Sequence, residues 1–277
     1  SLELGLAKPA KKEFKGMLRV EGMQYQTSMP DKPKLNSNLL LSSSFHFRYE
    51  NNFSQSGVDL SLGRDLDLQR SEFILRELFT AIPLANETSY LSVGRKLEYW
   101  SEVDNNWNLG LWQPYTYIDA LRPQRQGLLG AFLRLQNTWF DFLAYATPYF
   151  IPTMGPEIRE KDGSLESDSR WFRSPSSSFP LNGKETRLVY SLDVPDIAKL
   201  VENPGRGFRL RLGEKQGFWM STSYGYKPMN SLALKYKSRL FLPEKDPNTG
   251  QVTMQPAVLY HEVMGTDFGY QNDGFEF

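Results

Sequence analysis

The chain has 277 residues, and its 32 Lys and Arg are balanced by 32 Asp and Glu, so the formal net charge is zero. This balance argues against a nucleic-acid binder, because such proteins carry an excess of basic residues. Aromatic residues make up 14% of the sequence, which does not fit an intrinsically disordered protein. The longest stretches without Asp, Glu, Lys or Arg have fifteen residues, 142–156 and 247–261, and both contain proline, so the sequence offers no helical membrane span.

The absence of Cys excludes disulfides, thiolate nucleophiles and Cys-ligated metals. The sequence begins at Ser1 and shows no signal segment, so we expect a mature chain or an excised domain without its targeting sequence. No internal repeat or linker divides the chain. We therefore expect a single domain, residues 1–277.

Alternation of apolar and polar residues is the dominant pattern, and it predicts strands with one apolar and one polar face. The clearest segments, in chain order, are residues 39–49, 58–63, 90–100, 186–193, 208–212, 218–226 and 231–242. Turn residues at 213–217 and 227–230 separate the last three, so we expect residues 208–242 to form a three-stranded antiparallel meander. A short helix is expected at residues 194–201.

Segment length separates a soluble β protein from a membrane barrel. Strands of soluble sandwiches have about 5–6 residues, whereas a strand that crosses an outer membrane needs about 9–11. The longer segments here belong to the second class, and their apolar faces lie opposite Arg, Lys, Ser and Glu. The predicted fold class is all-β: an antiparallel up-and-down transmembrane β-barrel of about 12 or more strands, or the N-terminal portion of a larger barrel.

One region carries a specific resemblance. It consists of Leu91-Ser92-Val93-Gly94-Arg95-Lys96, Trp100-Ser101-Glu102-Val103-Asp104 and Trp107-Asn108-Leu109-Gly110-Leu111-Trp112-Gln113-Pro114. This region resembles porin-like outer-membrane β-barrels of Gram-negative bacteria, in which a strand ending in Gly-Arg leads into an acidic loop with Trp. The resemblance implies an outer-membrane channel or a structural barrel, with the lipid bilayer and lipopolysaccharide as partners and a homo-oligomeric assembly.

The end of the sequence departs from that pattern. Outer-membrane barrels end in an alternating apolar strand with a terminal Phe, but Gln271 and Asp273 interrupt the alternation before Phe277. Residues 272–274 instead have the composition of a turn.

The polar faces of the predicted strands supply candidate lumen-lining residues. These are Arg48, Lys96, Glu98, Arg134, Arg187, Arg209, Arg211, Lys235, Lys237 and Arg239. Facing a lumen, such a basic ladder would favour anions. The preferred alternative is that cross-strand acidic partners neutralise these cations, because the net charge of the chain is zero.

Aromatic residues gather near predicted strand ends, as in the girdles of outer-membrane barrels. The candidate interface aromatics are Tyr99, Trp100, Trp107, Trp112, Tyr149, Tyr224 and Tyr226. A large soluble β protein would also place Tyr and Trp at the margins of its sheets, and that alternative remains open.

The sequence supports an enzyme less well than a barrel. Glu98, Glu102 and Asp104 have the residue type needed for glycoside hydrolysis, but the two carboxylates of such a pair usually come from different elements, so a solvated acidic loop is preferred. His46 and His261 have no accompanying nucleophile or metal-ligand motif. We expect no enzyme activity, and no motif indicates NAD, ATP, zinc or haem.

The sequence therefore predicts a porin-like channel in the bacterial outer membrane that passes small hydrophilic solutes by diffusion. Residues 113–126 and 152–183 are candidate extracellular loops or a lumen constriction. The alternatives are a soluble carbohydrate-binding β-sandwich or β-propeller domain, and a structural or adhesive outer-membrane barrel without an open pore.

Overall fold

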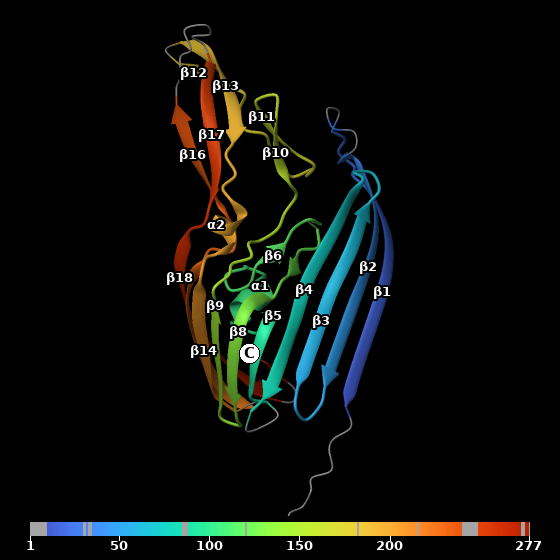
Figure 1. Cartoon of the computed structure of the whole chain (residues 1–277), viewed down its shortest axis with the longest axis vertical. Coiled ribbons are helices and arrows are strands. Elements are labelled where there is room, and N and C mark those ends of the chain that lie inside the picture. The colour runs from blue at the N-terminus through green and yellow to red at the C-terminus, as the bar shows by residue number, and fades with distance from the viewer. Residues whose placement is uncertain are drawn as a thin grey trace, which may run out of the picture.

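Ten long antiparallel strands and one short one form a single curved sheet in the computed structural model (Figure 1). In sheet order they are β1 (Lys11–Gln24), β2 (Ser37–Glu50), β3 (Gln55–Asp65), β4 (Arg70–Pro83), β5 (Tyr90–Lys96), β8 (Leu128–Gln136), β9 (Phe140–Thr147), β14 (Gly205–Gly213), β15 (Gly217–Pro228), β18 (Tyr260–Asn272) and β19 (Phe275–Glu276). The structure describes residues 10–29, 32, 35–84, 88–119, 121–181, 183–214, 216–239, 249–272 and 275–276.

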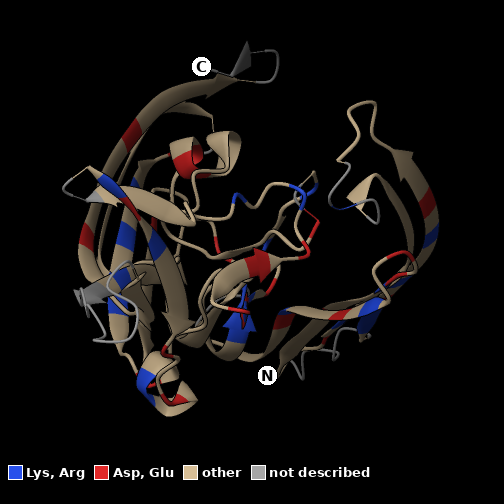
Figure 2. Ribbon diagram, turned by 90° about the horizontal axis from the view of Figure 1, so that it is seen from above, with Lys and Arg blue, Asp and Glu red and all other residues tan. Residues whose placement is uncertain are grey.

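The predicted all-β, antiparallel character is confirmed, but a closed barrel is not found. The ladder of the large sheet runs from β1 to β19, and these two ends do not pair with each other in the described residues. Seen from above, the sheet curves around segments that lie inside it (Figure 2). The transmembrane barrel is therefore treated below as a proposal.

Side-chain alternation gives the sheet two chemically different faces. The convex face carries large apolar residues that are exposed, such as Leu18 of β1 and Phe268 of β18, which are 83% and 79% exposed. The concave face carries charged residues, as the intervening positions Arg48 and Asp267 illustrate. The period-two pattern of the sequence follows from this geometry, because successive side chains of a strand point to opposite faces.

Connections differ in length at the two ends of the sheet (Figure 1). At one end they are short: residues 51–54, 84–89, 137–139 and 214–216. At the other end lie three long insertions, residues 97–127, 148–204 and 229–259. One end of the sheet thus has short connections, and the other bears the long ones.

A smaller sheet extends beyond the end with the long insertions. It contains β12 (Ser178–Leu181), β13 (Lys184–Leu192), β17 (Thr249–Ala257) and β16 (Ala233–Arg239), in that order, and the β13–β17 pair is parallel. A hairpin of β10 (Ile158–Lys161) and β11 (Ser164–Ser167) lies close to β13.

The predicted meander is wrong in its third strand. The strand β14 does pair with β15, but β15 pairs next with β18, and β16 pairs with β17. Residues 227–230 are not a hairpin turn, because the Met229 amide donates to the carbonyl of Leu259 and the chain continues in the same direction. Pro228 and Asn230 are therefore turn-type residues at a bend between two sheets.

Two short helices accompany the strands. The helix α1 (Glu102–Trp107) follows β5, and α2 (Ile197–Val201) starts after Asp196, whose carboxylate accepts from the Ala198 amide. The expected helix at 194–201 is thus present in shortened form. Within the described residues no helix is long and apolar enough to cross a membrane.

Candidate functional site

The interior of the curved sheet holds the chain between β5 and β8, residues 97–127, which we call the inner segment. It contains α1, β6 (Tyr115–Thr116) and β7 (Gln124–Arg125). At one side the Ser101 hydroxyl donates to Asp267 of β18, at 3.2 Å. At the other side Arg122 donates to the carboxylate of Glu21 on β1. The inner segment thus crosses the interior from the last long strand of the sheet to the first.

The chain enters the interior through an irregular end of β5. Gly94 has a positive φ of 126°, and any side chain there would collide with the carbonyl oxygen of Leu78. Beyond it Arg95 and Lys96 are both buried, and the Arg95 guanidinium donates to Gln126 and to the Gly127 carbonyl. Arg95 therefore joins the beginning of the inner segment to its end.

Buried polar groups hold the inner segment in shape. Ser101 caps α1, and the Asp104 carboxylate accepts the amides of Leu111 and Trp112, at 2.9 and 3.1 Å. The Asn230 amide donates to the carbonyls of this loop from the wall. The expected solvated acidic loop is therefore wrong for Asp104, which is buried and works as a structural acceptor, and for Glu98, which is also buried.

Two tyrosines of the inner segment remain neutral donors. Burial raises the pKa of Tyr99, and a hydrogen bond to Glu102 acts in the same direction. Burial also raises the pKa of Tyr115, whose hydroxyl donates to the side chain of Asn108. Neither phenol therefore brings a negative charge into the interior near neutral pH.

One half of the interior is packed with apolar side chains. Trp100 and Trp112 stack with their ring centroids 4.5 Å apart, and Phe132, Leu143 and Tyr145 of β8 and β9 surround them. The two indoles are only 1% and 2% exposed. Their predicted place in a membrane-interface girdle is therefore wrong, because the inner segment folds them into a core.

The other candidate interface aromatics divide between the two faces. Tyr224 and Tyr226 lie on the convex face of β15, as a girdle requires. Tyr99 and Trp107 belong to the inner segment, where Tyr99 packs on Arg209 and Trp107 is exposed on α1. Tyr149 lies in the long insertion after β9. Of the seven candidate interface aromatics, only Tyr224 and Tyr226 thus lie on the face that the girdle prediction requires.

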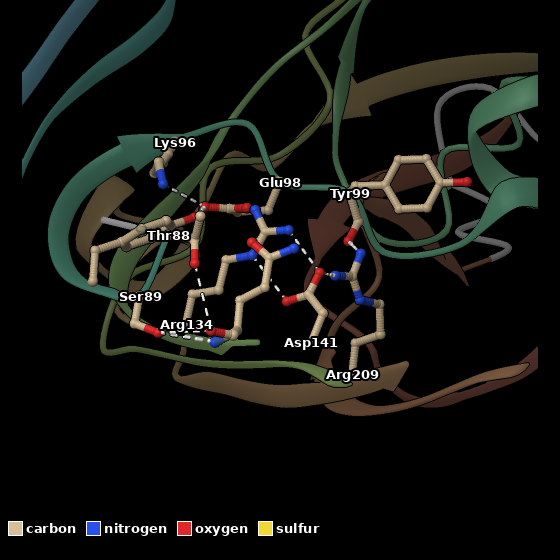
Figure 3. A network of polar contacts seen from close by, with 10 residues as sticks. Thr88, Ser89, Lys96, Glu98, Tyr99, Arg134, Asp141 and Arg209 are labelled. Atoms are coloured by element: carbon tan, nitrogen blue, oxygen red, sulfur yellow. Dashed lines mark hydrogen bonds and ion pairs between the residues drawn. The ribbon is translucent and has the colours of Figure 1, made fainter. Parts of the chain in front are cut away.

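Four of the candidate lumen-lining residues meet in one polar network on the concave face (Figure 3). Asp141 of β9 accepts from Arg134 on one side and from Arg209 on the other. Nearby, Glu98 accepts from Lys96 at 2.6 Å and from the hydroxyl of Tyr90 at 2.5 Å. Every charge of this network has an opposite charge in contact.

A second network lies on the wall formed by β2, β3 and β4. Arg48 donates to Glu77 at 2.7 Å, while Asp59 accepts from Arg76 at 3.3 Å and lies 3.4 Å from His46. The sequence analysis did not select Arg76 or Glu77. The signal is a pair of adjacent charges in residues 73–79, which are otherwise apolar. A β-bulge opposite Asp59 turns both charged side chains toward the interior.

The remaining candidate lumen residues are dispersed. Arg211 lies on the concave face of β14, over the ring of Trp219. Arg187, Lys235, Lys237 and Arg239 belong to the smaller sheet, and the side chains of Lys237 and Arg239 lie outside the described part of the structure. The prediction that these residues line the lumen is therefore wrong for these four, because β13 lies in the insertion after β9 and the chain after β15 continues into the smaller sheet.

Two hollows lie on the concave side of β1 to β4. The central hollow, of about 380 Å³, separates this wall from residues 116–125 of the inner segment. The short-turn hollow, of about 680 Å³, is lined near the short connections by residues that include Gln55, Tyr90 and Arg134. The interior is thus asymmetric, with a packed half beside β8 and β9 and a polar, open half beside β1 to β4.

Comparison with known proteins adds no assignment. No family model matches the chain, and a search of curated proteins finds no match.

Proposed function

We propose that this chain forms the wall of a porin-like β-barrel in the bacterial outer membrane and passes small hydrophilic solutes by diffusion. The observation that carries the proposal is the chemical difference between the two faces of the sheet. The convex face is apolar and exposed, and the concave face bears paired charges. A barrel in lipid requires this arrangement, whereas a soluble sandwich buries its apolar face.

The distribution of charge on the convex face supports a membrane band. The charged residues there lie close to strand ends, as Arg64 in β3, Arg206 in β14 and Glu262 in β18 do. Between them the convex positions are apolar or weakly polar, for example Phe208 and Leu212. A charge is least unfavourable near the headgroups and most unfavourable at the bilayer centre, so this distribution matches a lipid environment.

The unequal connections support an orientation. Outer-membrane barrels have short turns on the periplasmic side and long loops on the outside. The proposal accordingly places residues 51–54 and 137–139 in the periplasm, and residues 148–204 outside, next to lipopolysaccharide.

Lipid also sets a requirement for the sheet edges. Unpaired backbone amides and carbonyls are strongly unfavourable in hydrocarbon, so spanning sheets are closed. The two edges of the large sheet, at β1 and at β18–β19, have no partner strand in the described residues, so in the membrane both edges must be paired.

The ion pairs of the concave face predict weak ion selectivity. Arg48, Arg134 and Arg209 each contact a carboxylate. These contacts favour a pore whose basic residues are neutralised by carboxylates over a pore with a basic ladder that selects anions.

Planar bilayers test the proposal. The purified full-length chain should need detergent, should change its gel mobility on heating in SDS, and should produce stepwise ion currents after reconstitution. Reversal potentials in a salt gradient should stay close to zero. A chain that remains soluble without detergent and migrates identically with and without heating would contradict the barrel. A detergent-requiring chain without currents would support a structural barrel instead.

A further inference from the structure

We propose that the central hollow binds an uncharged, hydroxyl-rich solute, a sugar or a polyol. The hollow lies between the concave face of β2 to β4 and the strand pair β6–β7 of the inner segment. This inference rests on the proposed function only in treating the ligand as a solute that passes through the interior. The site itself is defined by side chains on both sides of the hollow.

Two buried hydroxyls without partners line the hollow from opposite sides. Thr116 of β6 is 2% exposed, and its Oγ1 has no hydrogen-bond partner among the described residues. Ser61 on β3 is half-buried, and its Oγ atom is inaccessible and has no partner among the described residues. A buried hydroxyl that lacks a partner destabilises a fold, so such groups are rare and usually have a specific reason. Both residues line the hollow, so rotation of either side chain about χ1 would turn its hydroxyl toward a ligand there, which would supply the missing partner.

Most of the charged groups around the hollow already contact an opposite charge, which favours an uncharged ligand. Asp59 is bonded to Arg76, Glu72 accepts from Arg70 at 2.8 Å, and Arg122 pairs with Glu21. An ionic ligand would have to compete with these existing pairs. A hydroxyl group both donates and accepts, so it can add to the remaining lone pairs of a carboxylate without displacing the arginine.

Size and apolar contacts agree with a sugar-like molecule. A volume of about 380 Å³ lies in the lower part of the range of small-molecule sites, roughly 300–1,000 Å³. Leu40 and Ile74 are buried side chains of the wall that line the hollow, next to hydroxyls such as that of Ser44. Sugars present C–H faces as well as hydroxyls, and this mixed lining offers contacts for both.

The chain provides matched controls. Ser92 of β5 is a buried serine whose Oγ also has no partner in the described part of the structure, but it does not line the hollow. Thr147 of β9 is a buried threonine whose Oγ1 donates to the Tyr149 carbonyl at 2.8 Å. The variants Ser61→Ala and Thr116→Val remove the hydroxyls that line the hollow, and Ser92→Ala and Thr147→Val remove equivalent hydroxyls elsewhere.

Isothermal titration of the detergent-solubilised full chain tests the site, with glucose, sucrose and sorbitol as uncharged probes and glutamate and lysine as charged ones. We expect at least one uncharged probe to bind, and the charged probes to bind more weakly. Thr116→Val and Ser61→Ala should each weaken that binding roughly five- to tenfold, as expected for one lost hydrogen bond. Ser92→Ala should leave the affinity unchanged, and heat-dependent gel mobility verifies that each variant is folded.

The outcomes separate this inference from the channel. Tighter binding of glutamate or lysine, or sugar binding that Thr116→Val and Ser61→Ala leave intact, would overturn the site. In bilayers, the bound sugar should reduce the current of the unmodified chain and reduce it less in Thr116→Val. Sugar binding without any current would refute the channel and leave the site standing. Currents without binding of any uncharged probe would refute the site alone.

Discussion

Glu21 and Arg122 form an ion pair between residues 101 positions apart, which joins the first strand of the large sheet to the inner segment. The same segment is bonded through Ser101 to Asp267, on the last long strand. It therefore links the two sides of the large sheet through its interior, and in the described residues these sides do not pair with each other. This link makes the inner segment a structural element of the wall and also the boundary of the central hollow.

Release of this link should loosen the inner segment. We expect Arg122→Ala to increase amide hydrogen exchange of residues 116–126 by a few-fold, because an exposed pair contributes modestly. Arg159→Ala, which breaks an exposed pair with Asp168 in the β10 region, is the matched control and should leave these amides unchanged. Equal exchange in the Arg122→Ala variant and the unmodified chain would show that Glu21 does not restrain the segment.

The two-sided contact of Asp141 predicts a large effect on stability. Asp141→Asn keeps the shape of the side chain but leaves Arg134 and the buried Arg209 without their counter-charge. Removal of one member of a buried charge cluster typically lowers the free energy of unfolding by about 3–5 kcal/mol. Asp168→Asn, in the exposed pair with Arg159, should change it by about 1 kcal/mol or less. Urea titration of both variants in detergent measures the difference, and equal midpoints would contradict the role of Asp141.

Buried threonines with and without partners should respond differently to the same substitution. Thr147→Val removes hydrogen bonds to the Tyr149 backbone, and we expect a loss of about 1 kcal/mol in the free energy of unfolding. Thr116→Val removes a hydroxyl that has no partner in the described structure, so the ligand-free protein should keep or gain stability. A loss in Thr116→Val as large as that in Thr147→Val would indicate a structural partner for Thr116. Urea titrations of the two variants side by side provide the measurement.

The sequence predicts local structure well where a residue's surroundings follow from its strand. Alternation identified the strands around Phe45, Phe208 and Phe218, and it assigned Arg48 and Arg134 to the polar face. Each side chain of a strand has only two directions, so the pattern of polarity defines the face.

Contacts that depend on the path of the inner segment could not be predicted in this way. An aromatic near a strand end has the same sequence context whether it faces lipid or packs inside, so Trp100 and Trp112 were assigned to the wrong environment. The sequence places Asp104 in water, although the two amides that donate to its carboxylate, those of Leu111 and Trp112, lie only seven and eight positions away. Two sites, near Gly213 and near Asn230, have the composition of a turn, but the chain reverses only at the first of them. The sequence does not distinguish the two sites, so the pairing of β15 with β18 could not be predicted.

The convex face gives the most direct test of a membrane environment. Phe268 is 79% exposed and lies within the apolar part of β18, whereas Glu262 lies near one end of the same face of the same strand. In lipid, Phe268→Arg should lower the free energy of unfolding by about 2–4 kcal/mol if the site is close to the bilayer centre, and Glu262→Arg should lower it by about 1 kcal/mol or less. In water, an exposed Phe contributes little, and Phe268→Arg would be neutral or would improve solubility. Folding titrations into lipid vesicles, read by heat-dependent gel mobility, distinguish the two environments, and equal behaviour of the two variants would argue that this face does not contact lipid.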